Sequence, residues 1–237
     1  MFSNYDRYFA RCVERGLPEK RLEVMRSALI LAGGTGSRLG LDKSLLEFEG
    51  RPLIWWSVER LNCVTDEVVV VARNDRQSEL LKHIVPAARL TCDCEYGFGP
   101  VAGLATGIRY SRSKYVFATG CDLPFLNVKV IEKLFELAED YDAAVPKWSN
   151  GMIEPLHAVY ERRATYRACF IALEQGEKKI SVPLRNLRIR DVPVELLLPF
   201  DPELSTFFNL NTEKDLELAR RLWIRFDASK SGRLNKQ

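Results

Sequence analysis

The sequence of 237 residues predicts an α/β fold, with a single doubly wound, mostly parallel sheet and helices on both faces. Short apolar runs alternate with segments of helical periodicity along most of the chain, which is the order expected of βαβ units. The run "DEVVVVA" at 66–72 has no polar alternation, as is typical of a strand buried on both sides of a parallel sheet. Glycine-rich loops follow two of the predicted strands, and such loops often approach a phosphate.

The predicted strands share short apolar runs that end in polar or glycine-rich turns. In chain order they cover residues 28–31, 66–72, 88–92, 115–119, 142–146, 154–160 and 192–200.

The predicted helices share apolar residues at helical spacing. They cover residues 1–26, 52–61, 76–84, a stretch from about 101, 128–139, 162–176 and a last helix that starts after Thr212. Pro52 is suited to a helix start, Gly176 closes a helix, and Thr212 is an N-cap followed by acidic residues.

Three segments are expected along the chain. Residues 1–26 form an N-terminal helical extension, packed on the outside or docked on a partner protein. Residues 27–226 form the α/β domain, and the polar residues 227–237 form a disordered tail.

The composition excludes several classes of protein. A net charge of +3 is too small to favour nucleic acid or a membrane as the main partner. The six cysteines include no CxxC pair and the two histidines are isolated, so we expect buried thiols and no zinc site. The sequence has no apolar run of transmembrane length and no secretory signal, which predicts a cytoplasmic protein.

The first glycine loop, "LAGGTGSRLGLDKS" at 31–44, matches neither of the two best-known phosphate fingerprints. A P-loop requires glycine before its lysine, but Asp42 precedes Lys43. A dinucleotide fingerprint fits at Gly34 and Gly36, but Leu39 occupies its third glycine position. The loop is therefore neither a P-loop nor a typical Rossmann turn.

The chemistry of this loop still suits a polyphosphate. Glycines allow backbone N–H groups to approach a ligand, and Arg38 and Lys43 add two cations beside them. The alternative from the residues alone is a tight turn with two solvated cations.

A second candidate is Asp122, in "ATGCDLPFL" at 118–126. Its predicted strand ends at the sheet edge where open α/β folds bind ligands. A carboxylate beside a triphosphate is tolerated when Mg²⁺ bridges them, so Asp122 is the candidate metal ligand. The alternative is an aspartate that only forms the turn before Leu-Pro.

The pattern L-A-G-G-x-x-S-R-x-G-x-D-K, followed by G-R-P-L at 50–53, resembles the signature of the molybdenum cofactor guanylyltransferase family. The resemblance covers about 28–218 and includes G-P-x-x-G at 99–103, C-D-x-P at 121–124 and N-x-N-T at 209–212. It implies a nucleotidyltransferase domain over 27–226 with the nucleotide-diphospho-sugar transferase-like variant of the Rossmann-type fold.

The same resemblance implies a set of site residues. The nucleotide contacts would be Leu31, Ala32, Gly33, Gly34, Lys43, Asp93, Gly103 and Asp122. The catalytic residues would be Arg38, Lys43 and Asp122, with Mg²⁺ on Asp122. The acceptor contacts would be Lys178, Lys179, Asn209 and Asn211. One departure concerns the asparagine that some family members place after the second strand, where this chain reads Val71-Ala72-Arg73-Asn74. That nucleotide contact is not carried over, since Asn74 could replace it only through a shifted loop.

The implied reaction transfers GMP from GTP to the terminal phosphate of the molybdenum-molybdopterin cofactor and releases pyrophosphate. Cytidylyl relatives tend to have alanine where this chain has Gly33, which favours the larger guanine. We also expect transient contact with cofactor-biosynthesis or acceptor enzymes. The alternatives are CTP as donor, cobinamide phosphate or a sugar phosphate as acceptor, and a non-catalytic nucleotide-binding partner of cofactor-maturation proteins.

Overall fold

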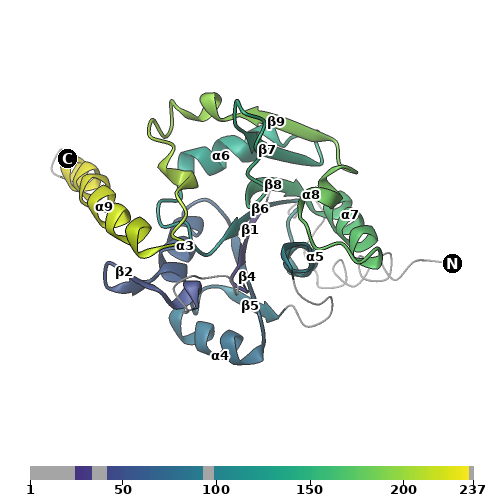
Figure 1. Ribbon diagram of the computed structural model, residues 1–237, viewed down its shortest axis with the longest axis horizontal. Helices are drawn as coiled ribbons and strands as arrows, with labels where there is room; N and C mark the ends of the chain where they lie inside the picture. The colour runs from purple at the N-terminus through teal and green to yellow at the C-terminus, as the bar shows by residue number, and fades with distance from the viewer. Residues whose placement is uncertain (1–24, 34–41, 93–98, 235–237) are drawn as a thin grey trace.

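The computed structural model describes residues 25–33, 42–92 and 99–234, with side chains described as far as residue 223. Its centre is a sheet of seven strands within this described part (Figure 1). The strands are β1 (Arg26–Leu31), β4 (Glu67–Ala72), β5 (Arg89–Cys92), β6 (Tyr115–Gly120), β7 (Ala143–Lys147), β8 (His157–Glu161) and β9 (Ile189–Pro193).

The strand order β5-β4-β1-β6-β8-β7-β9 confirms the doubly wound, mostly parallel sheet. β1 pairs in parallel with both β4 and β6, whereas β8 is antiparallel to both of its neighbours. The chain moves outward from β1 to β4 and β5, then returns to place β6 on the other side of β1. The strand order therefore reverses between β1 and β6, and open α/β sheets bind ligands at the carboxyl ends of such a pair.

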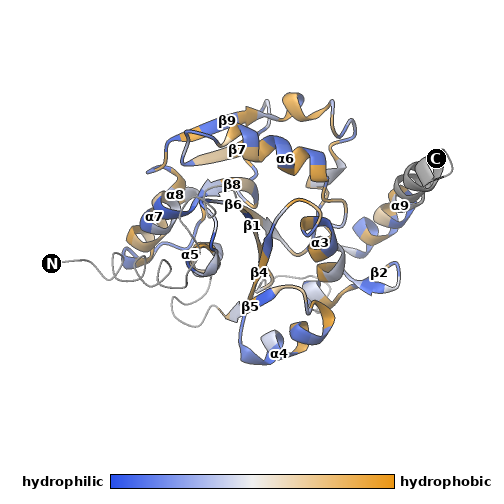
Figure 2. Cartoon of the chain, turned by 180° about the vertical axis from the view of Figure 1, so that it is seen from behind, coloured by the Kyte–Doolittle hydropathy of each residue, from blue (hydrophilic) through white to orange (hydrophobic). Residues whose placement is uncertain are grey.

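Helices cover both faces of the sheet (Figure 1). One face carries α5 (Pro100–Tyr110), α7 (Arg162–Glu174) and the short α8 (Ser181–Leu184). The other carries α3 (Leu53–Leu61), α4 (Asp75–Ile84) and α6 (Val128–Leu137). Figure 2 shows that the hydrophobic parts of these helices and of the central strands face one another. No helix in the described residues is both long enough and apolar enough to cross a membrane.

Side chains of β1 alternate between the two cores, as the period of a strand requires. Ala28 and Ile30 pack with α3, α4 and α6, whereas Leu29 packs with α5 on the opposite face. All three side chains are fully buried, which fixes the register of the central strand.

Two glycines allow α5 to lie close to β1. A Cβ atom on Gly107 would come within 2.0 Å of Leu29 Cδ1, and one on Gly103 within 3.1 Å of Leu31 Cδ2. Glycine is present at these two positions of α5 because leucine side chains of β1 occupy the space that a larger side chain would need.

A small hairpin and the last helix lie outside this sheet (Figure 1). The hairpin joins β2 (Glu47–Phe48) and β3 (Arg51–Pro52), and both of its turn residues have positive φ. Its buried Phe48 packs in one aromatic cluster with residues of α3 and of α9 (Glu213–Leu234). This cluster connects the last helix to the segment that follows the first glycine loop.

Three short 3₁₀ helices complete the described elements: η1 (Lys43–Leu45), η2 (Val194–Leu197) and η3 (Ser205–Phe207).

Two sequence predictions are wrong. A strand over 192–200 is not formed, because β9 ends at Pro193 and η2 follows, with leucines at 196 and 198 exposed. The expected disordered tail is also incorrect for 227–234, because α9 continues to Leu234. The polar composition of that segment indicated exposure to solvent, but the segment contains no proline, so the helix can continue through it. The extension at 1–24 lies outside the described residues.

The close packing of α5 on β1 leads to a test. Gly107→Ala should lower the free energy of unfolding by about 1–3 kcal/mol, because the new methyl group overpacks against the buried Leu29. This penalty opposes a gain of about 1 kcal/mol from replacing glycine by alanine in a helix. Urea unfolding measures the difference.

Gly103→Ala is the matched control, because its new methyl group would meet only the end of the Leu31 side chain. It should be markedly less destabilising than Gly107→Ala. Equal stability of the two variants would contradict the packing argument.

Candidate active site

Three segments that are distant in the sequence meet at the carboxyl ends of β1 and β6. Lys43 Nζ lies 2.9 Å from Asp122 Oδ2 and also donates a hydrogen bond to Asn211 Oδ1, at 2.5 Å. Lys43 comes from η1, Asp122 follows β6, and Asn211 precedes α9. The side chains of Lys43 and Asp122 are 15% and 19% exposed, so their charges are largely shielded yet reachable by a ligand.

Asp42 fixes the position of Lys43. One of its carboxylate oxygens accepts hydrogen bonds from the backbone N–H and the hydroxyl of Ser44. The other accepts hydrogen bonds from Gln77 Nε2 at 2.7 Å and from Arg73 Nη2 at 3.1 Å. Asp42 therefore caps η1 and also ties it to the segment after β4.

Gln77 connects both ends of the first glycine loop. Its amide nitrogen donates to the Ala32 carbonyl at 3.0 Å and to Asp42, and its amide oxygen accepts from Arg73 N at 2.7 Å. The residue is only 3% exposed, so these hydrogen bonds are shielded from water. Gln77 is a positioning residue that fixes where the loop begins and where it ends.

Asp122 is held by the backbone around it. Leu210 N donates a hydrogen bond to the Asp122 carbonyl at 2.9 Å, which brings the segment before α9 against the end of β6. A Cβ on Gly120 would lie 2.7 Å from Asp122 Oδ1, so glycine is needed for this carboxylate position. Burial raises the pKa of the adjacent Cys121 thiol well above its usual value, and this group stays neutral beside the carboxylate.

The two asparagines flank the buried Leu210. Asn211 contacts Lys43, and Asn209 lines a cavity together with Asp122. The alternation expected from their spacing is therefore present, with Leu210 in the core and the two amides on the site side.

The structure describes only part of the expected nucleotide loop. Leu31 ends β1, Ala32 follows it, and the partly exposed Gly33 is the last described residue before the loop. A Cβ on Gly33 would be 3.5 Å from Arg73 Cα, an ordinary contact. The predictions for Gly34, Arg38 and Asp93 fall outside the described residues.

Gly103 lies inside a helix and not ahead of one, and its expected nucleotide contact stays a prediction. The prediction placed its backbone near the nucleotide, ahead of the helix, but α5 already begins at Pro100 and Gly103 is buried against Leu31. In the structure Gly103 allows helix and strand to pack closely. The Asn74 side chain caps α4, where it accepts a hydrogen bond from Gln77 N.

Lys178 and Lys179 lie on an exposed segment between α7 and α8. The backbone of Lys178 packs beside Gly99, where a Cβ would lie 3.4 Å from the Lys178 carbonyl oxygen. This contact places the segment at the start of α5. Within the described residues, neither lysine forms a hydrogen bond or an ion pair with Asp122.

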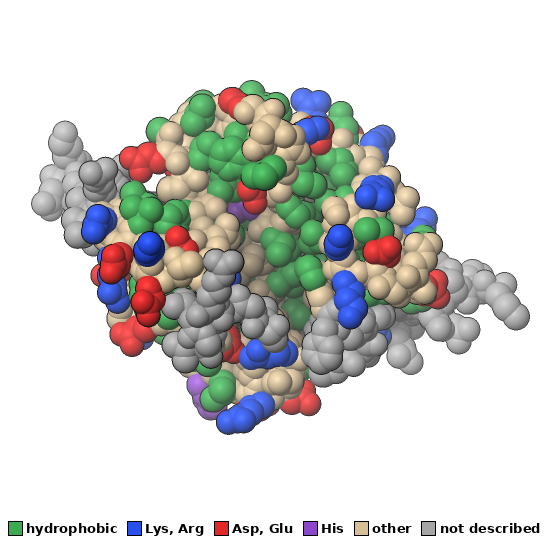
Figure 3. Space-filling view, in the orientation of Figure 1, with side chains coloured by type: hydrophobic (Ala, Val, Ile, Leu, Met, Phe, Trp, Pro, Cys, Tyr) green, Lys and Arg blue, Asp and Glu red, His purple; other side chains and the backbone are tan. Residues whose placement is uncertain are grey.

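A cavity of about 140 Å³ opens beside Asp122. It is lined by Gly120, Asp122, Leu123, Glu154, Leu156, His157, Phe207 and Asn209. The space-filling view shows the molecule hollowed near the centre of one face, with hydrophobic side chains along part of the hollow (Figure 3). The lining combines apolar walls with two carboxylates, an imidazole and an amide.

His157 is the most deeply buried polar group of this cavity, at 1% exposure. Its Nε2 lies 3.2 Å from Thr206 Oγ1, and its ring packs edge-on against Phe117 and Phe207. Nδ1 has no hydrogen-bond partner among the described residues. Burial lowers the pKa of His157 to about 3, so the imidazole is neutral at pH 7.

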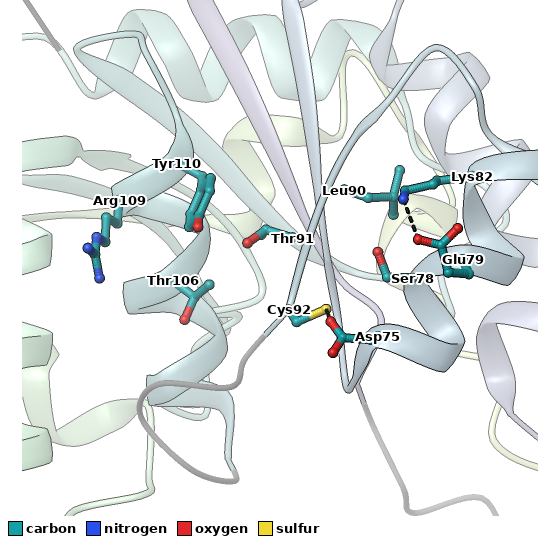
Figure 4. Close-up of a pocket in the computed structure, with 10 residues that line it drawn as sticks. All are labelled: Asp75, Ser78, Glu79, Lys82, Leu90, Thr91, Cys92, Thr106, Arg109 and Tyr110. Atoms are coloured by element: carbon teal, nitrogen blue, oxygen red, sulfur yellow. Dashed lines mark hydrogen bonds and ion pairs between the residues drawn. The ribbon is translucent and has the colours of Figure 1, made fainter.

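A larger cavity, of about 370 Å³, lies elsewhere, between α4, β5 and α5 (Figure 4). Asp75, Glu79 and Lys82 line one side of it, and Arg109 and Tyr110 line the other (Figure 4). None of its lining residues is a predicted site residue. Choosing a site by cavity volume alone would therefore have led away from Lys43 and Asp122.

Metal-ligand chemistry at the site is limited to few protein groups. The described residues contain no cluster of three or more His, Cys, Asp or Glu side chains that could hold a metal ion.

Of four described cysteines, Cys121 and Cys169 are buried, Cys92 is intermediate and Cys63 is exposed, so the expectation of buried thiols is only half correct.

Sequence reasoning missed Asp42, Gln77, Glu154 and His157 as parts of this region. Asp42 lies inside the recognised motif, but its role appears only when Gln77 is placed beside it. Gln77 is on a helix with mostly polar residues, and nothing in the local sequence marks it as buried. A lone histidine in a predicted strand gives no signal that its ring borders a cavity.

The state of His157 predicts a pH dependence of stability. Between pH 6.5 and about 3 the unfolded chain binds a proton that the folded protein excludes, so stability falls as pH falls through this range. From pH 7 to pH 5 this loss amounts to about 2 kcal/mol. Urea unfolding at both pH values should show a loss that is smaller by this amount in His157→Phe. An equal loss in both proteins would contradict a neutral, buried imidazole.

Comparisons with known proteins agree with this geometry. Residues 28–188 match the family model described as the MobA-like NTP transferase domain. A relative from Methanosarcina mazei, named probable molybdenum cofactor guanylyltransferase, is 38% identical over 81% of this chain and 88% of its own length. A molybdenum cofactor guanylyltransferase from Desulfosudis oleivorans is 33% identical over 88% of this chain and 98% of its own.

A solved structure shares the fold. The crystal structure of molybdopterin-guanine dinucleotide biosynthesis protein A from Archaeoglobus fulgidus superposes with a TM-score of 0.75 and 33% sequence identity. The match covers 84% of this chain and 99% of the other. The strand order, the convergence of Lys43, Asp122 and Asn211, and these similarities lead to one conclusion: the chain belongs to the MobA-like NTP transferase family.

Proposed function

We propose that this enzyme transfers GMP from GTP to the terminal phosphate of the molybdenum-molybdopterin cofactor and releases pyrophosphate. The observation that carries the proposal is the meeting of Lys43, Asp122 and Asn211 at the switch point of the sheet. Asp122 and Asn211 lie 79 and 168 positions after Lys43 in the sequence. Each of the three residues belongs to a different part of the recognised pattern. The names of the relatives support the same donor and acceptor.

In this proposal the protein acts by positioning and by charge. The backbone of Leu31–Gly34 holds the nucleotide, and Lys43, with Arg38, neutralises the phosphates that leave as pyrophosphate. The acceptor phosphate attacks the α-phosphorus in line, which requires both substrates to be held in one orientation. Asp42 and Gln77 keep the Lys43 ammonium group at the required place.

Asp122 fits the role of a magnesium ligand. Its carboxylate is accessible, and the amide oxygens of Asn209 and Asn211 belong to the same region. Mg²⁺ is usually bound by one or two carboxylates plus substrate phosphates, so a site with few protein ligands suits it. When bound there, Mg²⁺ would supply electrostatic stabilisation of the reacting phosphates.

The remaining expectations are part of the same proposal. Asn209 and Asn211 hold the acceptor beside Asp122, and Lys178 and Lys179 attract its phosphate near the start of α5. Asp93 contacts the nucleotide. We also propose that the enzyme acts in the cytoplasm and transfers its product through brief contact with cofactor-biosynthesis or acceptor enzymes.

The central test is Asp122→Asn, which preserves the shape of the side chain and removes its charge. Pyrophosphate release with GTP, molybdenum-molybdopterin and Mg²⁺ should fall on the order of 100-fold or more, because charge stabilisation at the phosphates is lost. A coupled phosphate assay measures the rate, and circular dichroism confirms folding.

Asp191→Asn is the matched control, because Asp191 is exposed and its ion pair among the described residues is with Lys147, away from Asp122. It should release pyrophosphate at the wild-type rate. A wild-type rate for Asp122→Asn would refute the role of this carboxylate.

Gly33→Ala tests the choice of nucleotide. The alanine methyl group fits against Arg73 within the protein, so an effect on binding would come from the ligand. The ratio of GTP to CTP affinity should fall by about tenfold, the cost of losing one good contact. Calorimetric titration of both nucleotides measures the ratio, and a wild-type protein that prefers CTP would overturn the assignment of GTP.

A further inference from the structure

We infer that the cavity beside Asp122 binds the 2-amino-4-oxopyrimidine edge of the pterin acceptor, with His157 and Glu154 as the residues that recognise it. The inference rests on the proposed function, because it names the part of the acceptor that this site holds. It assigns a specificity role to two residues outside the recognised motifs.

The hydrogen-bond network assigns the proton of His157. Thr206 Oγ1 accepts a hydrogen bond from Asn127 N at 3.0 Å and lies 3.2 Å from His157 Nε2. Within the described residues, the hydroxyl proton has a partner only in the arrangement in which it is donated to Nε2. Asn127 N and His157 Nε2 are the partners of this hydroxyl among the described residues. Nε2 is therefore the acceptor, and the proton of the neutral ring is on Nδ1.

The Nδ1–H group is a buried donor that lacks a partner among the described residues. Leaving such a group unpaired costs free energy, and a ligand that supplies an acceptor atom removes that cost. The carbonyl oxygen of a 4-oxopyrimidine is an acceptor of this kind.

Glu154 offers the complementary acceptor. One carboxylate oxygen accepts a hydrogen bond from Trp148 Nε1 at 2.7 Å, and the second accepts none from the residues that the structure describes. A carboxylate binds N–H donors strongly, and the 2-amino group and adjacent ring N–H provide two of them. With Asp122 also on the wall, the cavity favours a neutral, donor-bearing group over a phosphate.

The size and walls of the cavity suit a flat ring. Cavities of about 150 Å³ accommodate benzene in other proteins, and this one measures about 140 Å³. Phe207 and Leu156 provide apolar walls, whereas Asn209 and Asp122 line the side on which we place the transfer reaction.

Guanine has the same edge, so GTP is the competing source of this chemistry. The pterin is favoured because none of the described residues at the nucleotide loop, Leu31–Gly33, lines the cavity.

The experiment titrates the full chain with pterin, followed by its fluorescence, and separately with GTP by calorimetry. Glu154→Gln keeps an oxygen for Trp148 but loses the charge, and His157→Phe keeps an aromatic ring but loses the donor. Each variant should bind pterin about tenfold or more weakly, with GTP affinity unchanged. Lumazine, which lacks the 2-amino group but keeps the ring N–H, should bind the wild type more weakly than pterin and should lose less affinity than pterin in Glu154→Gln.

Glu174→Gln and His83→Phe are the matched controls, because both residues are exposed and neither lines the cavity. Both should bind pterin as the wild type does. Glu154 is only partly buried, so Glu154→Gln decides the question if His157→Phe does not fold.

Three results would overturn the inference: failure of the wild type to bind pterin, unchanged pterin affinity in folded Glu154→Gln, or weakened GTP binding with pterin affinity retained. The last result would assign the cavity to guanine. Pyrophosphate release by the wild type with GTP and molybdenum-molybdopterin tests the proposed function separately, so the two can fail independently.

Discussion

The parallel pairing of β1 with β6 is the constraint on which the rest of the site depends. In this pairing Leu31 lies opposite Gly120, so the chain leaves both strands at the same edge of the sheet. The described ends of the first glycine loop and Asp122 therefore lie at one edge of the sheet, although residues 32–114 separate the two strands. Lys43 can reach Asp122 only in this topology, and the Leu210–Asp122 backbone hydrogen bond adds the third segment to the same edge. The strand order determines where the site lies, and the side chains at that edge supply its chemistry.

A second layer of contacts turns this proximity into a fixed geometry. Gln77 bonds to the carbonyl before the glycine loop and to the carboxylate after it, so the loop is bounded on both sides by one buried amide. Gly120 serves a related purpose at β6, because any larger residue would displace the Asp122 carboxylate. Residues that touch no substrate thus determine where the reacting groups lie, as is common where catalysis relies on positioning.

The fold was largely predictable because its signals are local. Continuous apolar runs predicted β4 and β6, and the glycine, proline and threonine caps predicted several helix ends. Lys43, Asp122 and the two asparagines were found through the spacing of a recognised pattern. Gln77, Glu154 and His157 were not, because their roles depend on partners 33 to 49 residues away or on a cavity formed by several segments. The strand predicted at 192–200 failed because an apolar run of that length is also compatible with a 3₁₀ turn that packs only some of its leucines.

The reversed direction of β8 has a consequence for how such enzymes can diverge. Because β8 is antiparallel to β6, its first residue, His157, and not its last, lies at the ligand edge, opposite Thr119. The connection from β7 to β8 therefore begins and ends at this edge, and Glu154 belongs to it. Such a connection can change length and sequence without altering the register of the strands that carry the nucleotide loop and Asp122. With the cavity assigned to the acceptor as proposed, acceptor recognition can evolve separately from the transfer machinery, within one sheet and without a second domain.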